Sequence, residues 1–165
     1  MKKIFIINGS GGVGKDTFVN LVSKRVKTMN VSSVDKVKEI AKLIGWDGVS
    51  KTEKDRKFLS DLKLLTTKYC DMPFQYMKQK VEEFNNSEYD CLFLHIREPE
   101  EIRKAVKEFN AQTILVIRES VAPILSNMAD RNVYNYKYDF EVINNGTLEN
   151  LDYIVKYFVE ENIIC

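Results

Sequence analysis

The sequence predicts an α/β fold in which a parallel sheet of roughly five strands is covered by helices on both faces. Two observations support this fold class. Short apolar runs alternate with segments whose apolar residues recur at helical spacing, and each helical segment is long enough for a right-handed crossover. Polar residues follow the apolar runs directly, as they do where parallel strands end beside a ligand. We therefore expect a single α/β domain over residues 1–165.

Composition and charge indicate a globular protein that recognises its ligands locally. Hydrophobic residues make up 44% of the chain and charged residues 30%, which is typical of a folded domain. The 25 basic and 24 acidic residues nearly cancel, so we expect no nucleic acid and no membrane partner. No apolar stretch approaches the roughly 20 residues that span a bilayer, and we expect a cytoplasmic protein. Cys70, Cys91 and Cys165 are widely spaced, which favours reduced thiols over disulfides or a zinc site.

The first elements are a strand, a glycine-rich turn and a helix. Residues 4–7 form a continuous apolar run that stops at Asn8, and a helical pattern begins near Lys15. The apolar stripe of this helix is expected at Phe18, Leu21, Val22, Val26 and Met29. Residues 31–34 are mostly small or β-branched, which favours a second strand.

Three helical segments then follow one another before the next strand. The first ends at Gly45, where a C-terminal glycine belongs. The second begins with a capping-box pair, Ser50 and Glu53, and the third opens at Asp71. A crossover between parallel strands needs only one helix. We therefore expect the stretch at about 36–85 to be an insertion that holds a second ligand.

The second half of the chain alternates strand and helix again. Residues 91–96 are expected to form a buried strand, and Pro99 with its acidic neighbours opens a helix. Residues 113–117 and 140–143 are the next strands, and Thr147 caps the last helix.

A long polar connection interrupts this alternation between the last two strands. Its pattern is only weakly periodic and contains one proline and several tyrosines. A mobile lid over about 119–138 is one expectation, and a short surface helix followed by a loop is the other.

The turn after the first strand has the spacing of the phosphate-binding loop G-x-x-x-x-G-K. Its residues are Gly9, Ser10, Gly11, Gly12, Val13, Gly14, Lys15, Asp16 and Thr17. Glycine lets backbone N–H groups converge on a phosphate chain, and the following helix adds its positive end. Lys15 would reach the β- and γ-phosphates, and Asp16 displaces the usual magnesium-binding hydroxyl to Thr17. A turn that binds nothing is the alternative, but the strand before and the helix after favour a phosphate site.

Charged residues follow the other strands as well. Asp35 comes after the second expected strand, Arg97 after the third and Arg118 after the fourth. Carboxyl ends of parallel strands meet at one edge of a sheet, so these side chains are expected near the phosphate loop.

Taken together, these segments resemble the P-loop nucleoside monophosphate kinase superfamily, and within it the deoxynucleoside monophosphate kinase-like and phosphomevalonate kinase-like branch. The loop GSGGVGKDT has the branch's Asp after the lysine, and LFLHIREPEEI is similar to its Asp-x-Arg segment. The tail YDFEVINNGTLENL resembles the final strand, turn and helix of these small kinases. The resemblance implies the three-layer sandwich of P-loop NTPases over nearly the whole chain.

The resemblance also implies ATP as the phosphate donor, Mg²⁺ held with the help of Asp16 and Thr17, and an acceptor bound by the insertion. The acceptor site would use Asp35, Lys38, Arg56 and Arg97, and the ATP side would use the loop and Arg118. Lys15, Arg97 and Arg131 would be the catalytic residues, with Arg118 and Arg131 flanking the lid. His95 stands where the branch has its aspartate, which bears on metal binding or acceptor orientation.

The resulting hypothesis is an ATP-dependent kinase that moves the γ-phosphate to a small phosphorylated acceptor, a nucleoside or deoxynucleoside monophosphate. Gathered cations and loop amides suit the charge that spreads over the oxygens during phosphoryl transfer. Two alternatives remain open. One is the same chemistry on phosphomevalonate or a dephospho-coenzyme precursor, and the other is a nucleotide-binding regulatory protein with weak turnover.

Overall fold

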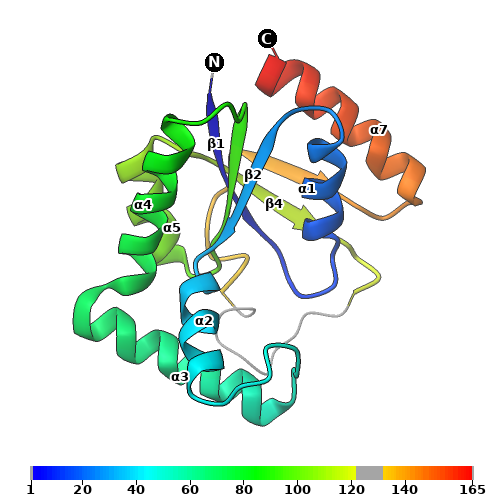
Figure 1. Ribbon diagram of the computed structural model, residues 1–165. Helices are drawn as coiled ribbons and strands as arrows, with labels where there is room; N and C mark the ends of the chain where they lie inside the picture. Colours follow the sequence, from blue (N-terminus) through cyan, green and yellow to red (C-terminus); the bar gives the residue numbers. More distant parts are fainter. Residues whose placement is uncertain (1, 122–131, 165) are drawn as a thin grey trace.

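The chain forms a five-stranded parallel sheet with helices on both faces, which confirms the predicted fold class (Figure 1). The computed structural model describes residues 2–121 and 132–164. The strands lie in the order β2-β3-β1-β4-β5, and every neighbouring pair is parallel. Their bounds are β1 Lys3–Asn8, β2 Thr28–Ser32, β3 Cys91–His95, β4 Gln112–Ile117 and β5 Phe140–Ile143.

Helices cover both faces of the sheet, and two further helices lie beyond its carboxyl edge. The described helices are α1 Lys15–Ser23, α2 Asp35–Leu43, α3 Glu53–Cys70, α4 Met72–Asn85, α5 Pro99–Phe109, α7 Leu148–Val159 and a π-helical turn η1 Glu160–Ile164. α1 and α7 pack on one face, and α4 and α5 pack on the other (Figure 1). α2 and α3 lie beyond the carboxyl ends of the strands. Among the described helices, none combines the length and the apolar character needed to cross a membrane.

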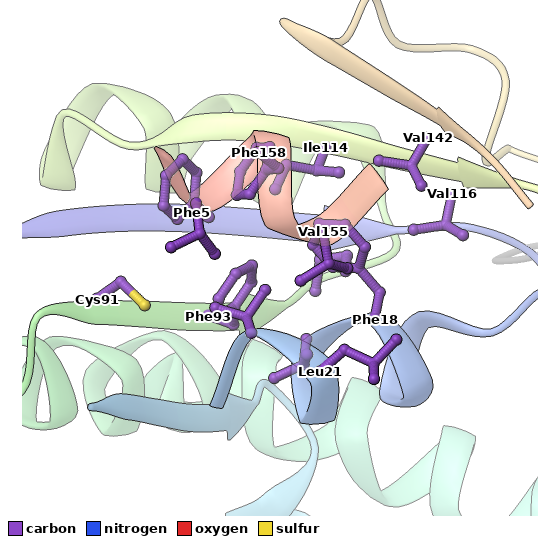
Figure 2. Close-up of a cluster of buried hydrophobic side chains, with 14 of the residues drawn as sticks. Phe5, Phe18, Leu21, Cys91, Phe93, Ile114, Val116, Val142, Val155 and Phe158 are labelled. Atoms are coloured by element: carbon purple, nitrogen blue, oxygen red, sulfur yellow. The ribbon is translucent and has the colours of Figure 1, made fainter. Parts of the chain in front are cut away.

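Four phenylalanine rings form the centre of the core beneath α1 and α7 (Figure 2). The ring of Phe5 on β1 lies 5.4 Å from that of Phe93 on β3 and 5.2 Å from that of Phe158 on α7. The ring of Phe18 on α1 lies 5.3 Å from that of Phe158. These spacings are typical of favourable aromatic pairs. The cluster holds α1 against β1, and so it fixes the two ends of the glycine-rich loop between them.

The second strand begins earlier than the sequence predicts. β2 starts at Thr28, and the preceding helix already ends at Ser23, so Val26 and Met29 lie outside its stripe. Pairing explains the difference, because Thr28 lies opposite Cys91 at the start of β3. Backbone hydrogen bonds to a neighbouring strand select strand ends that helical spacing alone does not reveal.

The cap of α3 also differs from the expected pair of Ser50 and Glu53. Thr52 is the N-cap: its hydroxyl accepts a hydrogen bond from the Asp55 N–H at 3.2 Å, and the Asp55 carboxylate accepts one from the Thr52 N–H at 3.0 Å. The N–H of Ser50 instead donates to the carboxylate of Asp47 at 2.8 Å. This stretch contains two capping-box patterns, Ser50 with Glu53 and Thr52 with Asp55. Only the second forms, because Ser50 is part of the turn held by Asp47.

The remaining helix predictions fit the structure closely. α4 follows Asp71, as predicted, and its buried face carries Phe74, Met77, Val81 and Phe84. The hydroxyl of Thr147 accepts a hydrogen bond from the Asn150 N–H and caps α7. α3 is different, because it has no fully buried residue, and Leu65 and Tyr69 are 64% and 88% exposed. The insertion is therefore attached to the sheet chiefly through α4.

Candidate functional site

The glycine-rich loop between β1 and α1 is closed in on two sides, by the backbone of β4 and by the side chain of Asn144. Gly9 has φ of 148°, and a Cβ there would lie 2.5 Å from the Val116 carbonyl oxygen of β4. Gly14 has φ of 100°, and a Cβ there would lie 2.5 Å from the side-chain amide of Asn144. Both positions require glycine for conformation and for space. Glycine at these two positions therefore lets the loop pack closely against β4 and Asn144.

Lys15 lies at the first position of α1, with its ammonium group folded over the loop. Its Nζ donates hydrogen bonds to the carbonyl oxygens of Gly9 at 2.5 Å and Ser10 at 2.9 Å. Gly14 is the N-cap of α1 and offers no capping side chain. A helix start leaves its first N–H groups without intrahelical partners and carries a partial positive charge. The loop thus combines a cation with a helix N-terminus, which together favour an anion.

Ser10 adds a second sign that the loop fits a ligand. Its side chain is buried, and its hydroxyl has no hydrogen-bond partner among the described residues. A buried hydroxyl without a partner is costly. A phosphate oxygen in the loop would be a suitable acceptor for it. The glycine cradle and the Ser10 hydroxyl together fit the phosphate chain of a nucleotide.

The two residues expected to help with magnesium are both accessible. Asp16 and Thr17 lie in the first turn of α1 and are exposed to solvent. No cluster of three or more His, Cys, Asp or Glu side chains that could hold a metal occurs within residues 2–121 and 132–164. Mg²⁺ in nucleotide sites takes only one or two protein ligands, with the rest from phosphates and water. The donors present therefore fit magnesium that arrives with a nucleotide.

His95 ends β3 beside this loop, and the strand register places it opposite Ile7 of β1 and Ser32 of β2. Its Nε2 lies 2.8 Å from the Asn30 Oδ1. Burial lowers the pKa of the imidazole below its ordinary value of 6.5, and Lys15 and Arg97 lower that pKa further. The carboxylates of Asp16 and Asp35 oppose this shift. His95 is therefore a neutral imidazole near neutral pH.

The electrostatic neighbours of His95 show which predicted site residues are gathered. These neighbours are Asp16, Lys15, Asp35 and Arg97. They come from α1, α2 and the segment after β3, and all lie at the carboxyl edge of the sheet. The Asp35 carboxylate also accepts a hydrogen bond from the Ser32 N–H at 2.7 Å, which holds the start of α2 to the end of β2.

Other predicted site residues are not among these electrostatic neighbours of His95. Arg56 is exposed on α3, and its Nε donates to the Lys51 carbonyl oxygen at 3.1 Å, at the start of its own helix. Lys38 is exposed on α2, and Arg118 is half-buried just after β4. Arg131 lies outside the described residues, as does much of the expected lid.

Three asparagines and one tyrosine support the site without having been predicted for it. The Asn144 side-chain amide donates to the Val13 carbonyl oxygen of the loop at 2.8 Å. The Asn8 side chain contacts Gly9, Arg97 and Tyr138, and Asn30 contacts His95. The sequence could have pointed to Asn8 and Asn144 only through their positions, because each directly follows or ends an apolar strand pattern. Nothing local in the sequence pairs either residue with its partner.

Comparisons with known proteins support the fold and leave the sequence without a family assignment. Neither the protein-family models nor the curated proteins contain a match to this sequence. TT1252 from Thermus thermophilus is similar in structure, with a TM-score of 0.58, 20% identity and 98% of each chain covered. Shikimate kinase from Acinetobacter baumannii, solved in complex with shikimate, has a TM-score of 0.50 and 11% identity over 99% of this chain and 95% of that one. At such identities the likeness shows the three-layer α/β fold alone.

Proposed function

We propose that this protein is an ATP-dependent phosphotransferase that moves the γ-phosphate to a small phosphorylated acceptor, most simply a nucleoside or deoxynucleoside monophosphate. One observation carries the proposal. The loop from Gly9 to Thr17 is closed in by β4 and Asn144, holds the Lys15 ammonium, and contains the buried hydroxyl of Ser10, which has no hydrogen-bond partner among the described residues. Such a cradle suits the triphosphate of a nucleotide. The kinase identity of one structural neighbour agrees with this assignment.

On the donor side, the loop amides and Lys15 hold the β- and γ-phosphates. Lys15 exchanges its contacts with the Gly9 and Ser10 carbonyls for phosphate oxygens, which are stronger partners for an ammonium group. Thr17 and Asp16 help to place Mg²⁺, which neutralises charge on the phosphates when it is bound. Arg118 is proposed to contact the nucleotide, and Arg131 to act from the segment at about 119–138 if that segment is a lid.

On the acceptor side, we assign the helical insertion at about 36–85 as the acceptor-binding part of a single domain over residues 1–165. Asp35 and Arg97 are the best supported contacts, because both act electrostatically on His95 beside the loop. The Arg97 guanidinium suits an acceptor phosphate, since its planar fork makes paired hydrogen bonds. Lys38 and Arg56 are assigned to the outer part of the acceptor site, which requires their exposed side chains to approach the loop.

A panel of acceptors tests this proposal directly. The purified protein is incubated with [γ-³²P]ATP, magnesium and single acceptors, which include nucleoside and deoxynucleoside monophosphates, phosphomevalonate, dephospho-coenzyme A and shikimate. We expect labelled product from a monophosphate, and none from the Lys15→Ala variant. Transfer only to phosphomevalonate or the coenzyme precursor would keep the chemistry and change the acceptor. No transfer to any acceptor would contradict the proposal.

A second function is favoured by His95. The neutral imidazole, hydrogen-bonded to Asn30, cannot supply the hard anionic oxygen that Mg²⁺ prefers. A nucleotide-binding regulatory protein with slow turnover would combine an intact phosphate loop with such a site. The two functions differ in the response to His95→Asp, measured with saturating magnesium-ATP on folded variants. If His95→Asp raises turnover while ATP affinity stays constant, the result favours the regulatory protein with slow turnover. If the parent protein is fast and the variant is slower, the histidine belongs to the catalytic mechanism.

A further inference from the structure

Asn8, the last residue of β1, makes a hydrogen-bonded connection that the phosphate-binding role of the loop does not require. Its side chain is completely buried and lies on the sheet face that packs against α4 and α5, the same face as Ile6. Its Nδ2 donates to the Arg97 carbonyl oxygen at 3.1 Å and to the Tyr138 hydroxyl at 2.7 Å. Its Oδ1 accepts a hydrogen bond from the Gly9 N–H at 2.8 Å.

Among side chains of similar size, asparagine can make all of these hydrogen bonds, whereas aspartate and leucine cannot. The carbonyl oxygen of Arg97 can only accept a hydrogen bond, and the Gly9 N–H can only donate one. An amide offers both functions in a fixed geometry. An aspartate of the same shape would set a carboxylate oxygen against the Arg97 carbonyl, and a leucine would remove the hydrogen bonds that Asn8 makes to both backbone groups.

Tyr138 completes the connection and is itself well anchored. Its hydroxyl accepts from Asn8 and donates to the Val133 carbonyl oxygen at 2.8 Å. A phenol is protonated at neutral pH and can donate, and burial raises the pKa of Tyr138 still further, from 10 to about 12. The next residue, Asp139, accepts hydrogen bonds from the Thr113 N–H at 2.7 Å and the Thr113 hydroxyl at 2.8 Å. Loss of the Tyr138 hydroxyl would therefore leave the backbone of this segment attached to β4.

We infer that Asn8 and Tyr138 are a positioning pair that holds the backbone of Arg97 against the start of the phosphate loop. The pair joins three segments that are far apart in the sequence: the end of β1, the segment just after β3 and residues 133–138. Arg97 and the loop carry opposite sides of the proposed reaction, the acceptor and the donor. A fixed distance between them sets how closely the acceptor oxygen approaches the γ-phosphate. The kinetic part of this inference rests on the proposed phosphotransferase function.

The Tyr138→Phe variant tests the pair with the smallest structural change. Tyr136→Phe is the matched control, because its ring contacts that of Tyr138 at 5.0 Å and its hydroxyl makes no hydrogen bond to the described residues. We expect kcat with ATP and a monophosphate acceptor to fall roughly tenfold in Tyr138→Phe, with KM for ATP within about twofold of the parent value. Tyr136→Phe should match the parent protein in both constants. Asn8→Asp should resemble Tyr138→Phe or be more severe.

A second measurement does not depend on activity. Amide hydrogen exchange of Gly9, followed by NMR on the free protein, reports whether the Asn8 side chain still holds the loop entrance. We expect exchange to be at least about threefold faster in Tyr138→Phe than in Tyr136→Phe, since one of the two anchors of the Asn8 amide is removed.

The two measurements separate this inference from the proposed function. An active parent protein whose kcat is unchanged by Tyr138→Phe overturns the positioning pair, whatever the exchange rates are. If the parent protein phosphorylates no acceptor, the proposed function fails and the exchange rates alone decide. Faster Gly9 exchange in Tyr138→Phe then supports the pair, and equal rates in both variants overturn it.

Discussion

The side-chain amide of Asn144 donates a hydrogen bond to the Val13 carbonyl oxygen at 2.8 Å, so the turn after β5 holds the phosphate loop from behind. The backbone N–H of Asn144 donates to the Ile117 carbonyl oxygen at 2.7 Å, which ties the same turn to the end of β4. Asn144 is only 5% exposed. One residue near the carboxyl end of the chain thus connects the loop near the amino end to the neighbouring strand.

Asn144→Asp is expected to destabilise the protein by about 1–3 kcal/mol, because a carboxylate would replace the donor that faces the Val13 carbonyl. Affinity for ATP should also fall, since the loop loses its support. Asn145→Asp is the control: the Oδ1 of Asn145 accepts from the Glu119 N–H, and aspartate keeps that acceptor. Urea unfolding and ATP titration measure both effects. Equal stability of the two variants would contradict this role of Asn144.

Gly9→Ala is expected to lower the free energy of unfolding by about 3 kcal/mol or more, because strain at a φ of 148° adds to the clash with the Val116 carbonyl. Gly45→Ala is a matched comparison with a φ of 109° and no atom within 4 Å of the new Cβ. It should cost only about 1–2 kcal/mol. Denaturant unfolding of both variants gives the difference. A Gly9 variant as stable as the Gly45 variant would show that the loop can move away from β4.

Lys15→Ala is expected to lower the rate of phosphoryl transfer at least about 100-fold, because the variant loses the cation nearest the phosphates. The fold should remain intact, since the Lys15 side chain is only half-buried and lies at the first position of α1. Lys24→Ala, an exposed change just after α1, serves as the control for lost charge. Single-turnover rates and circular dichroism provide the measurements. Turnover at the parent rate in a folded Lys15 variant would exclude the loop as the donor site.

Arg97→Lys is expected to raise KM for the acceptor roughly tenfold while KM for ATP stays nearly constant, because lysine keeps the charge and loses the paired hydrogen bonds. Arg103→Lys on α5 is the control, since Arg103 pairs with Glu100 on the same helix. Steady-state kinetics with each substrate varied separately distinguish the two constants. Equal weakening of both substrates would instead assign Arg97 to the donor side or to the general structure.

His95 is expected to titrate below its ordinary pKa of 6.5, because burial disfavours the imidazolium. The lowered pKa also fixes the direction in which the stability of the folded protein changes with pH. Below about pH 6.5 the unfolded chain takes up a proton that the folded protein resists, so stability falls as the pH is lowered through this range. His95 is the only histidine in the sequence, so its NMR resonances are unambiguous. His95→Gln should lack this part of the pH dependence, and an imidazole that titrates above pH 6.5 would contradict the prediction.

The sequence by itself determined the elements whose signals are local. Glycine spacing around Lys15 marks the loop, continuous apolar runs mark the buried parallel strands, and Thr147 marks the start of α7. These features depend on backbone conformation and capping within a few residues, so a single chain segment contains the needed information. The same reasoning predicted that polar residues at strand ends share one edge of the sheet.

Only the tertiary structure decided which of those polar residues meet. Asn8 and Tyr138 are separated by 130 positions, and Asn144 and Val13 by 131, so neither pair leaves a local pattern. β2 begins where β3 offers hydrogen-bond partners, and the Arg56 side chain donates a hydrogen bond to the Lys51 carbonyl oxygen at the start of its own helix. Such contacts depend on how the sheet orders its strands and on which helix covers which face. Those choices are made by the packing of the whole chain, and a pattern within one segment does not contain them.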